Sequence, residues 1–292
     1  MRRFLIGFAG SVLAVLSGCG RPAGPERGEL VAEGVATVRW EVRANGTDLV
    51  PVAVYFPATP DGFASGANLP ALVYVQGGAV EPSRYSWQAV ELAKRGYVVA
   101  MPRHPLDLAF FAVDFGQVAR AALLEPSRAG VFTTRPVLEG VVDPQRIAVA
   151  GHSLGGVVTM KLALAGGFNA AVVQASYSDP ADDAKLPALS IPTMYLAAKG
   201  DCMATEQQVR AGWAKVPAPS ALVVLEGVTH FQFSNADTND VQRGCPPTVS
   251  LDEAHARISA AMHAFLSAAL ASPPGVGEAQ LRAIPETQVE VR

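Results

Sequence analysis

The sequence predicts an α/β protein with a mostly parallel central sheet, an antiparallel N-terminal hairpin and helices on both faces of the sheet. Short apolar runs that suit buried strands alternate with helix-length segments, the order expected for a parallel sheet covered on both sides. Two strand-like runs, 35–43 and 49–56, flank Asn45-Gly46, the strongest short-range hairpin signal. Of the 292 residues, 50% are hydrophobic and 17% are charged, which excludes a disordered chain.

The remaining elements follow the hairpin in order. Residues 71–75 form an unbroken apolar run, as a strand buried on both faces requires. A helix is expected from about Ser83, with Trp87, Val90 and Ala93 at helical spacing and a basic, glycine-ended stop at 94–96. The same reasoning predicts strands at 97–101, 146–150, 170–175, 192–197 and 221–225, and helices at 107–124, after Gly155, at 204–215 and at 252–270.

Residues 1–18 are expected to be a targeting segment outside the fold. Arg2 and Arg3 form a positive n-region, and the apolar run 4–16 is too short to span a bilayer as a helix. The run ends in Leu-Ser-Gly-Cys at 16–19, which resembles the lipobox of bacterial lipoproteins, cleaved before a cysteine that is then acylated. The resemblance implies export to the bacterial cell envelope and attachment to a membrane surface through Cys19, on the periplasmic or outer side. An ordinary signal peptide is the alternative.

The mature chain divides into three parts. Residues 19–34, rich in Gly, Pro and charge, are expected to be a flexible tether, and 35–270 to be the folded domain. Residues 271–292, which begin near Ser-Pro-Pro-Gly, are expected to be a C-terminal tail on the surface or loose in solvent. The formal net charge is −3 and no block of Lys and Arg follows the N-terminus, so nothing indicates a nucleic-acid partner.

A candidate nucleophile lies in Gly-His-Ser-Leu-Gly at 151–155, between the strand 146–150 and a helix at 157–165. In this pattern Ser153 occupies a tight strand-to-helix turn, and the glycines two residues before and after it leave room for the turn. The pattern by itself is common, and a surface Gly/Ser loop is the alternative; the strand and helix around it favour the nucleophile.

These features together resemble the α/β-hydrolase family, and most closely the branch of dienelactone hydrolase, platelet-activating-factor acetylhydrolase and cutinase-like polyester hydrolases. The resemblance rests on Val-Ala-Val-Tyr-Phe-Pro at 52–57, on Val-Asp-Pro-Gln-Arg-Ile at 142–147 leading into the Ser153 motif, on Gly200-Asp201 after a strand, and on His230. It covers roughly 35–270 and implies an α/β-hydrolase fold without a large lid and a serine hydrolase that needs no cofactor. The motifs are not specific to a substrate.

The resemblance implies a general base late in the chain, on a loop above the sheet, where His230 follows the strand 221–225. His104, in a loop after a strand, is the rival. His152 lies beside Ser153 and is expected to point into neighbouring packing, and His255 and His263 are expected on or near the exposed face of the last helix.

The acid should lie between the serine and the histidine in sequence. Asp201 follows a strand through a glycine-assisted turn, and Asp179, with Asp182 and Asp183 nearby, is the runner-up after the preceding strand. The oxyanion hole should take one N–H from Leu154 and the other from Gly78 or Ala79, with Gln76 in place of the usual histidine of that loop and holding it through its amide.

Acylation of Cys19 leaves Cys202 and Cys245 as a pair that an oxidising compartment allows to bridge, with two free thiols as the alternative. A bridge would tie the acid loop to the segment after the histidine loop. No Cys-x-x-Cys or His/Cys cluster indicates a metal site.

The predicted activity is hydrolysis of carboxylic esters, either small molecules or polymers, through an acyl-enzyme. The short connection 176–190 leaves no room for a cap, and Phe110, Phe111, Tyr177 and Trp213 are candidates to line an open cleft, although aromatics at helical spacing are more often core. A secreted serine peptidase or amidase with the same triad, and an inactive surface-binding lipoprotein, are the alternatives.

Overall fold

The structure is a computed structural model that describes residues 25–44, 48–104, 112–131 and 136–292. The proposed targeting segment, Cys19, the Asn45-Gly46 turn, Phe110 and Phe111 lie outside the described residues.

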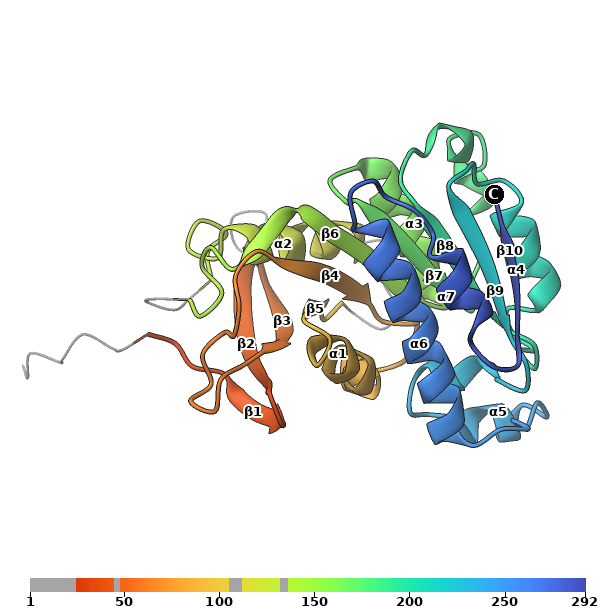
Figure 1. Cartoon of the computed structure of the whole chain (residues 1–292), viewed down its shortest axis with the longest axis horizontal. Coiled ribbons are helices and arrows are strands. Elements are labelled where there is room, and N and C mark those ends of the chain that lie inside the picture. The colour runs from red at the N-terminus through yellow and green to blue at the C-terminus, as the bar shows by residue number, and fades with distance from the viewer. Residues whose placement is uncertain (1–24, 45–47, 105–111, 132–135) are drawn as a thin grey trace, which may run out of the picture.

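In the part of the chain that the structure describes, ten strands form one sheet in the order β1-β2-β3-β5-β4-β6-β7-β8-β9-β10 (Figure 1). The strands are β1 Glu29–Ala32, β2 Val35–Ala44, β3 Asp48–Pro57, β4 Leu69–Val75, β5 Val98–Pro102, β6 Val142–His152, β7 Ala170–Gln174, β8 Thr193–Ala198, β9 Ser220–Leu225 and β10 Thr287–Val291. The block from β5 to β9 is parallel, and β1, β2, β3 and β10 add antiparallel strands at its two sides.

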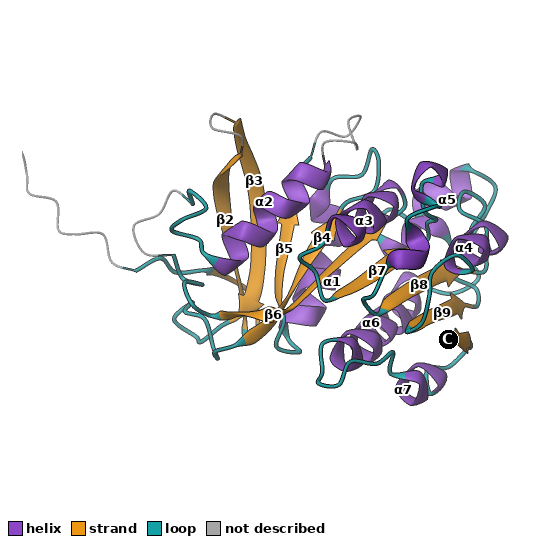
Figure 2. Cartoon of the chain, turned by 90° about the horizontal axis from the view of Figure 1, so that it is seen from above, coloured by secondary structure: helices purple, strands orange, loops and turns teal. Residues whose placement is uncertain are grey.

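Helices cover both faces of the sheet (Figure 2). On one face lie α2 Ala112–Leu124, α3 Leu154–Ala165 and α4 Glu206–Trp213, and on the other α1 Ser86–Ala93, α6 Leu251–Ala269 and α7 Glu278–Arg282. The described residues also include the short segments η1 Pro82–Tyr85, η3 Pro180–Asp182, η4 Leu186–Ala188, η5 His230–Phe233 and α5 Thr238–Gln242. Each face has its own apolar core, so the central strands are buried on both sides and are apolar throughout. The predicted fold class is confirmed.

The expectation that 271–292 form a tail outside the folded domain, on the surface or loose in solvent, is wrong. Residues 271–292 contain α7 and β10, and β10 pairs antiparallel with β9, with Val289 opposite Val223. Leu281 of α7 is fully buried against the α6 side of the sheet. The physical reason is that β9 is buried, so the backbone groups along its open edge need hydrogen-bond partners, and β10 supplies them.

The expected tether also ends earlier than predicted. Residues 29–32 form β1, which pairs antiparallel with the start of β2 across a turn at Gly34, whose φ is +70°. The Gly28 N–H donates to the Gly62 carbonyl at 2.8 Å. A four-residue edge strand among glycines, prolines and charges carries no periodic signal, so composition alone suggested a linker.

Among the helices of the described residues, none is both long and apolar enough to cross a membrane.

Candidate active site

Ser153 occupies the turn between β6 and α3 with φ 54° and ψ −123°, a backbone conformation that L side chains rarely adopt. The turn is possible because its neighbours are glycines. A Cβ on Gly151 would lie 2.3 Å from the Gly155 carbonyl oxygen, and one on Gly155 would lie 2.3 Å from that of Val75. The Ser153 N–H donates to the Gln174 carbonyl on β7 at 2.9 Å. The serine is therefore presented at the carboxyl edge of the parallel strands.

His230 follows β9 at the same edge and is 2% exposed. Its Nε2 lies 3.0 Å from Ser153 Oγ, and its Nδ1 lies 2.7 Å from Asp201 Oδ2. The structure thus brings Ser153, His230 and Asp201 together in one hydrogen-bonded chain. Because the histidine has one nitrogen on each partner, it can take a proton from the serine while the carboxylate holds the opposite N–H.

Asp201 is fixed by the backbone around it. It follows β8, and its Oδ1 accepts N–H groups from Met203 at 2.7 Å and Ala204 at 2.9 Å. Gly200 N–H donates to the Val228 carbonyl at 2.8 Å, which joins the acid loop to the histidine loop. The remaining oxygen of the carboxylate is free to face the imidazole.

A disulfide joins Cys202 to Cys245, as predicted, with 6.3 Å between their Cα atoms. Its position beside Asp201 adds a covalent link between the acid loop and the chain that follows the histidine loop.

Asp240 lies beneath the histidine loop and was missed by the sequence reasoning. Its Oδ2 accepts a hydrogen bond from Thr229 Oγ1 at 2.8 Å and from the Phe231 N–H at 2.9 Å, so one carboxylate holds the residues on both sides of His230. Burial raises the pKa of Asp240, and the bonds to Thr229 and Phe231 partly offset that rise. Nothing in the local sequence marks this aspartate, because its spacing from His230 matches no motif.

The rivals for the triad have other partners. Asp179, the runner-up acid, lies with its Oδ2 2.7 Å from Lys161 Nζ, and the hydrogen bond from Lys161 lowers its pKa. His104 is buried with its Nε2 3.3 Å from the Gln76 carbonyl. His255, expected near an exposed face, is instead half-buried and stacks on Trp87 of α1 with ring centroids 3.5 Å apart. Similarly, His263 is half-buried and meets Tyr97 edge-on.

The loop after β4 lies against the start of α3, where the second oxyanion donor was expected. A Cβ on Gly78 would lie 3.0 Å from Leu154 Cδ2, so Gly78 abuts the residue after the nucleophile. Ala79 has φ +56°, and the Val80 N–H donates to the Gly77 carbonyl at 3.3 Å, which closes a tight turn.

The expectation that Gln76 holds this loop through its amide is wrong, since no residue in the described part of the chain reaches either atom of that amide with a hydrogen bond. Instead, the Tyr85 hydroxyl accepts the Gly77 N–H at 3.1 Å. The side chain that secures the loop comes from the following η1 segment rather than from the loop itself, which local sequence does not indicate.

Three large hydrophobic side chains are exposed on the segments that follow parallel strands. Leu154, Tyr177 and Met203 are 38%, 39% and 39% exposed, and they follow the carboxyl ends of β6, β7 and β8, the same edge of the sheet as Ser153. Trp213, a candidate lining residue, is only 5% exposed and packs in the core, with its Nε1 bonded to Ser220 Oγ. Trp213 is therefore a core residue, which is the more common place for aromatics at helical spacing, and Tyr177 keeps its place as a candidate.

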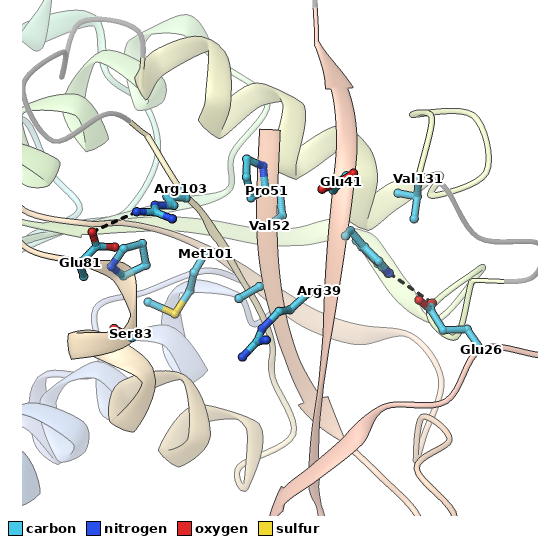
Figure 3. A pocket seen from close by; sticks show the side chains of 13 residues that line it. Glu26, Arg39, Glu41, Pro51, Val52, Glu81, Ser83, Met101, Arg103 and Val131 are labelled. Carbon is cyan, nitrogen blue, oxygen red and sulfur yellow. Dashed lines mark hydrogen bonds and ion pairs between the residues drawn. The ribbon is translucent and has the colours of Figure 1, made fainter. Parts of the chain in front are cut away.

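A separate hollow of about 640 Å³ lies between β2, β3, the end of β5 and the segment before α1 (Figure 3). It holds none of the three residues of the Ser153 chain. Three of its charged groups already have partners, since Arg103 pairs with Glu81 at 3.1 Å and Glu26 accepts from Trp40 Nε1 at 3.2 Å. We therefore assign the chemistry to the Ser153 edge.

Comparison with known proteins agrees with this fold. The profile of the alpha/beta hydrolase family matches residues 71–249. The chain is also similar to a bis(hydroxyethyl) terephthalate hydrolase of Streptomyces coelicolor, with 26% identity over 198 residues. That similarity covers 63% of this chain and 56% of the relative, so the chain spans little more than half of the relative's length.

Proposed function

The chain belongs to the alpha/beta hydrolase family, and we propose that it is an exported serine hydrolase that cleaves carboxylic esters. The observation that carries the proposal is the unbroken chain from Asp201 Oδ2 to His230 Nδ1 and from His230 Nε2 to Ser153 Oγ, at 2.7 and 3.0 Å. A serine hydroxyl becomes a competent nucleophile only when a positioned base takes its proton, and this arrangement supplies that base.

The proposed reaction has two steps. His230 takes the proton of Ser153 as the oxygen attacks the ester carbonyl, and the resulting imidazolium then protonates the leaving alcohol. Water enters next, loses a proton to His230 and attacks the acyl-enzyme, which releases the acid and restores Ser153. Asp201 holds the histidine tautomer and stabilises the imidazolium in both steps.

The negative charge on the carbonyl oxygen needs two N–H donors. We assign these to the backbone of Leu154, at the start of α3, and of Gly78. The choice of Gly78 over Ala79 rests on the close approach of Gly78 to the Leu154 side chain. Removal of one such donor lowers kcat by about 10²- to 10³-fold in serine hydrolases.

The proposed substrates are esters with an apolar acyl or aromatic group, either small molecules or polymer chains. Leu154, next to Ser153 in the chain, and Tyr177 and Met203, which follow β7 and β8, are exposed and would offer such a group an apolar surface. The name of the Streptomyces coelicolor relative points the same way, since its substrate is an aromatic diester. The connection between β7 and β8 holds only the short η3 and η4 segments, which leaves the site open to a chain laid across it.

The proposal extends to location. The motif at 16–19 supports cleavage before Cys19 and a lipid anchor on that cysteine in the bacterial cell envelope. The disulfide between Cys202 and Cys245 agrees with an oxidising compartment outside the cytoplasm.

The test is labelling of the purified protein with a fluorophosphonate, together with turnover of nitrophenyl esters of increasing acyl length. The wild type should be labelled at Ser153, and Ser153→Ala should lose both labelling and turnover while keeping its melting temperature. Retained turnover in Ser153→Ala would refute the nucleophile. A wild type that is not labelled would favour a surface-binding protein, and hydrolysis of aminoacyl amides in preference to esters would favour a peptidase.

A further inference from the structure

The hydroxyl of Tyr85 joins two backbone segments that the proposed reaction needs at a fixed separation. It accepts the N–H of Gly77 at 3.1 Å, directly before Gly78, and it lies 2.9 Å from Nδ1 of His152, directly before Ser153. Tyr85 is fully buried and comes from η1, outside both segments. One hydroxyl therefore ties the loop that carries one oxyanion donor to the turn that carries the nucleophile and the other donor.

A backbone N–H can only donate, so the Tyr85 oxygen accepts from Gly77. In the tautomer of His152 that carries its proton on Nε2, Nδ1 accepts the proton of Tyr85. Burial raises the pKa of Tyr85 and lowers the pKa of His152, which His230 lowers further. Both side chains therefore stay neutral around neutral pH, and the donor and acceptor roles do not change with ionisation of either group.

The packing around this hydroxyl is tight. A Cβ on Gly77 would lie 2.7 Å from the Tyr85 oxygen and 3.0 Å from His152 Nδ1, so only glycine lets the three groups meet. The His152 ring in turn lies 4.6 Å from that of His230 and stacks on Phe233 at 5.4 Å, centroid to centroid. A shift of Tyr85 would therefore displace the loop after β4 and the Ser153 turn. It would also displace the His152 ring, which packs beside His230.

We propose that Tyr85 is a positioning residue that sets the geometry of the oxyanion hole, acting through Gly77 and His152. The role rests on the proposed serine-hydrolase function. Without the hydroxyl, the Gly77 N–H and His152 Nδ1 lose their shared partner, and the two donors are no longer held at the spacing that the developing oxyanion requires.

The test is Tyr85→Phe, measured with a nitrophenyl ester and with a boronic acid that forms a tetrahedral adduct on Ser153. We expect kcat to fall about 10- to 100-fold while KM changes by less than about twofold. The inhibition constant of the boronic acid should rise by the same factor as kcat falls, because the adduct resembles the transition state. A purely structural role would lower the melting temperature without this parallel change.

Tyr74→Phe is the matched control. Tyr74 is also buried, its ring lies 5.3 Å from that of Tyr85, and its hydroxyl bonds to the amides of Gln88 and Gln174. Those two amides also bond to each other at 2.9 and 3.2 Å, so they keep partners in the variant, and its kcat should stay within about threefold of the wild type.

Should Tyr85→Phe fail to fold, a His152 pair tests the same link. His152→Asn offers an oxygen near the position of Nδ1 and should lose less kcat than His152→Ala. Equal losses in that pair would overturn the proposal. So would a Tyr85→Phe enzyme with kcat within about threefold of the wild type, an unchanged boronic acid constant, or an equal loss in Tyr74→Phe. If a fluorophosphonate does not label the wild type, the proposed serine-hydrolase function itself is refuted. If the wild type is labelled and Tyr85→Phe keeps its kcat, only the role of Tyr85 is refuted.

Discussion

Removal of the Cys202–Cys245 disulfide should cost the protein much of its stability but little of its activity. The bridge closes a loop with a sequence separation of 43 residues. On the chain-entropy relation, closing a loop of that length stabilises the folded state by about 4 kcal/mol at 25 °C. For a domain of this size the loss corresponds to a fall of about 10 °C in melting temperature.

The activity should survive because other contacts still hold the acid. Asp201 keeps the N–H groups of Met203 and Ala204, and Gly200 keeps its bond to Val228. We therefore expect kcat of the Cys202→Ser/Cys245→Ser double variant at 25 °C to fall by less than about tenfold.

The assay is urea and thermal unfolding of the double variant beside the oxidised wild type, each with and without reductant. Cys202 is exposed and Cys245 half-exposed, so a reductant can reach the bridge. Reductant should bring the wild type down to the melting temperature of the double variant and leave the double variant unchanged. A double variant with the same melting temperature as the oxidised wild type would refute the reasoning, because the closed loop would then contribute nothing to stability.

Three further predictions follow from the site and from the edge of the sheet. Asp201→Asn should lower kcat on a nitrophenyl ester by about 10⁴-fold, because the variant favours the wrong tautomer of His230. Asp179 pairs with Lys161, so Asp179→Asn should keep kcat within about twofold of the wild type. A larger loss in Asp179→Asn than in Asp201→Asn would assign the acid to Asp179. Ending the chain after Pro285 removes β10, exposes the edge of β9 and should lower the free energy of unfolding in urea by at least about 2 kcal/mol; an unchanged midpoint would mean that β10 adds nothing. Because burial raises the folded-state pKa of Asp240, its stabilising contribution is full below the unfolded pKa of about 3.9 and is lost as the pH rises through the folded value. Urea unfolding should therefore show the wild type losing stability relative to Asp240→Asn as the pH rises from below about 3.9; a pH-independent difference would contradict this.

Local pattern was enough for the fold class and for the tight turn at Ser153. Short unbroken apolar runs between turn-forming segments favour strands buried on both faces. The glycines at 151 and 155 are needed for the tight turn at Ser153, because a side chain at either position would collide with backbone. These steric and solvation requirements act over a short range, so they depend on residues that are adjacent in the sequence. The lipid anchor on Cys19 remains a prediction from the same kind of pattern.

The tertiary structure decided what depends on distance between remote residues. Asp179 and Asp201 both follow parallel strands, and only the folded chain brings one to His230 and the other to Lys161. Likewise, β10 is recognised as a strand only when the open edge of β9 lies beside it. The contacts of Tyr85 with Gly77 and His152, and of Asp240 with the histidine loop, have no local signature, because a hydrogen-bond partner across loops is set by the packing of every element between them.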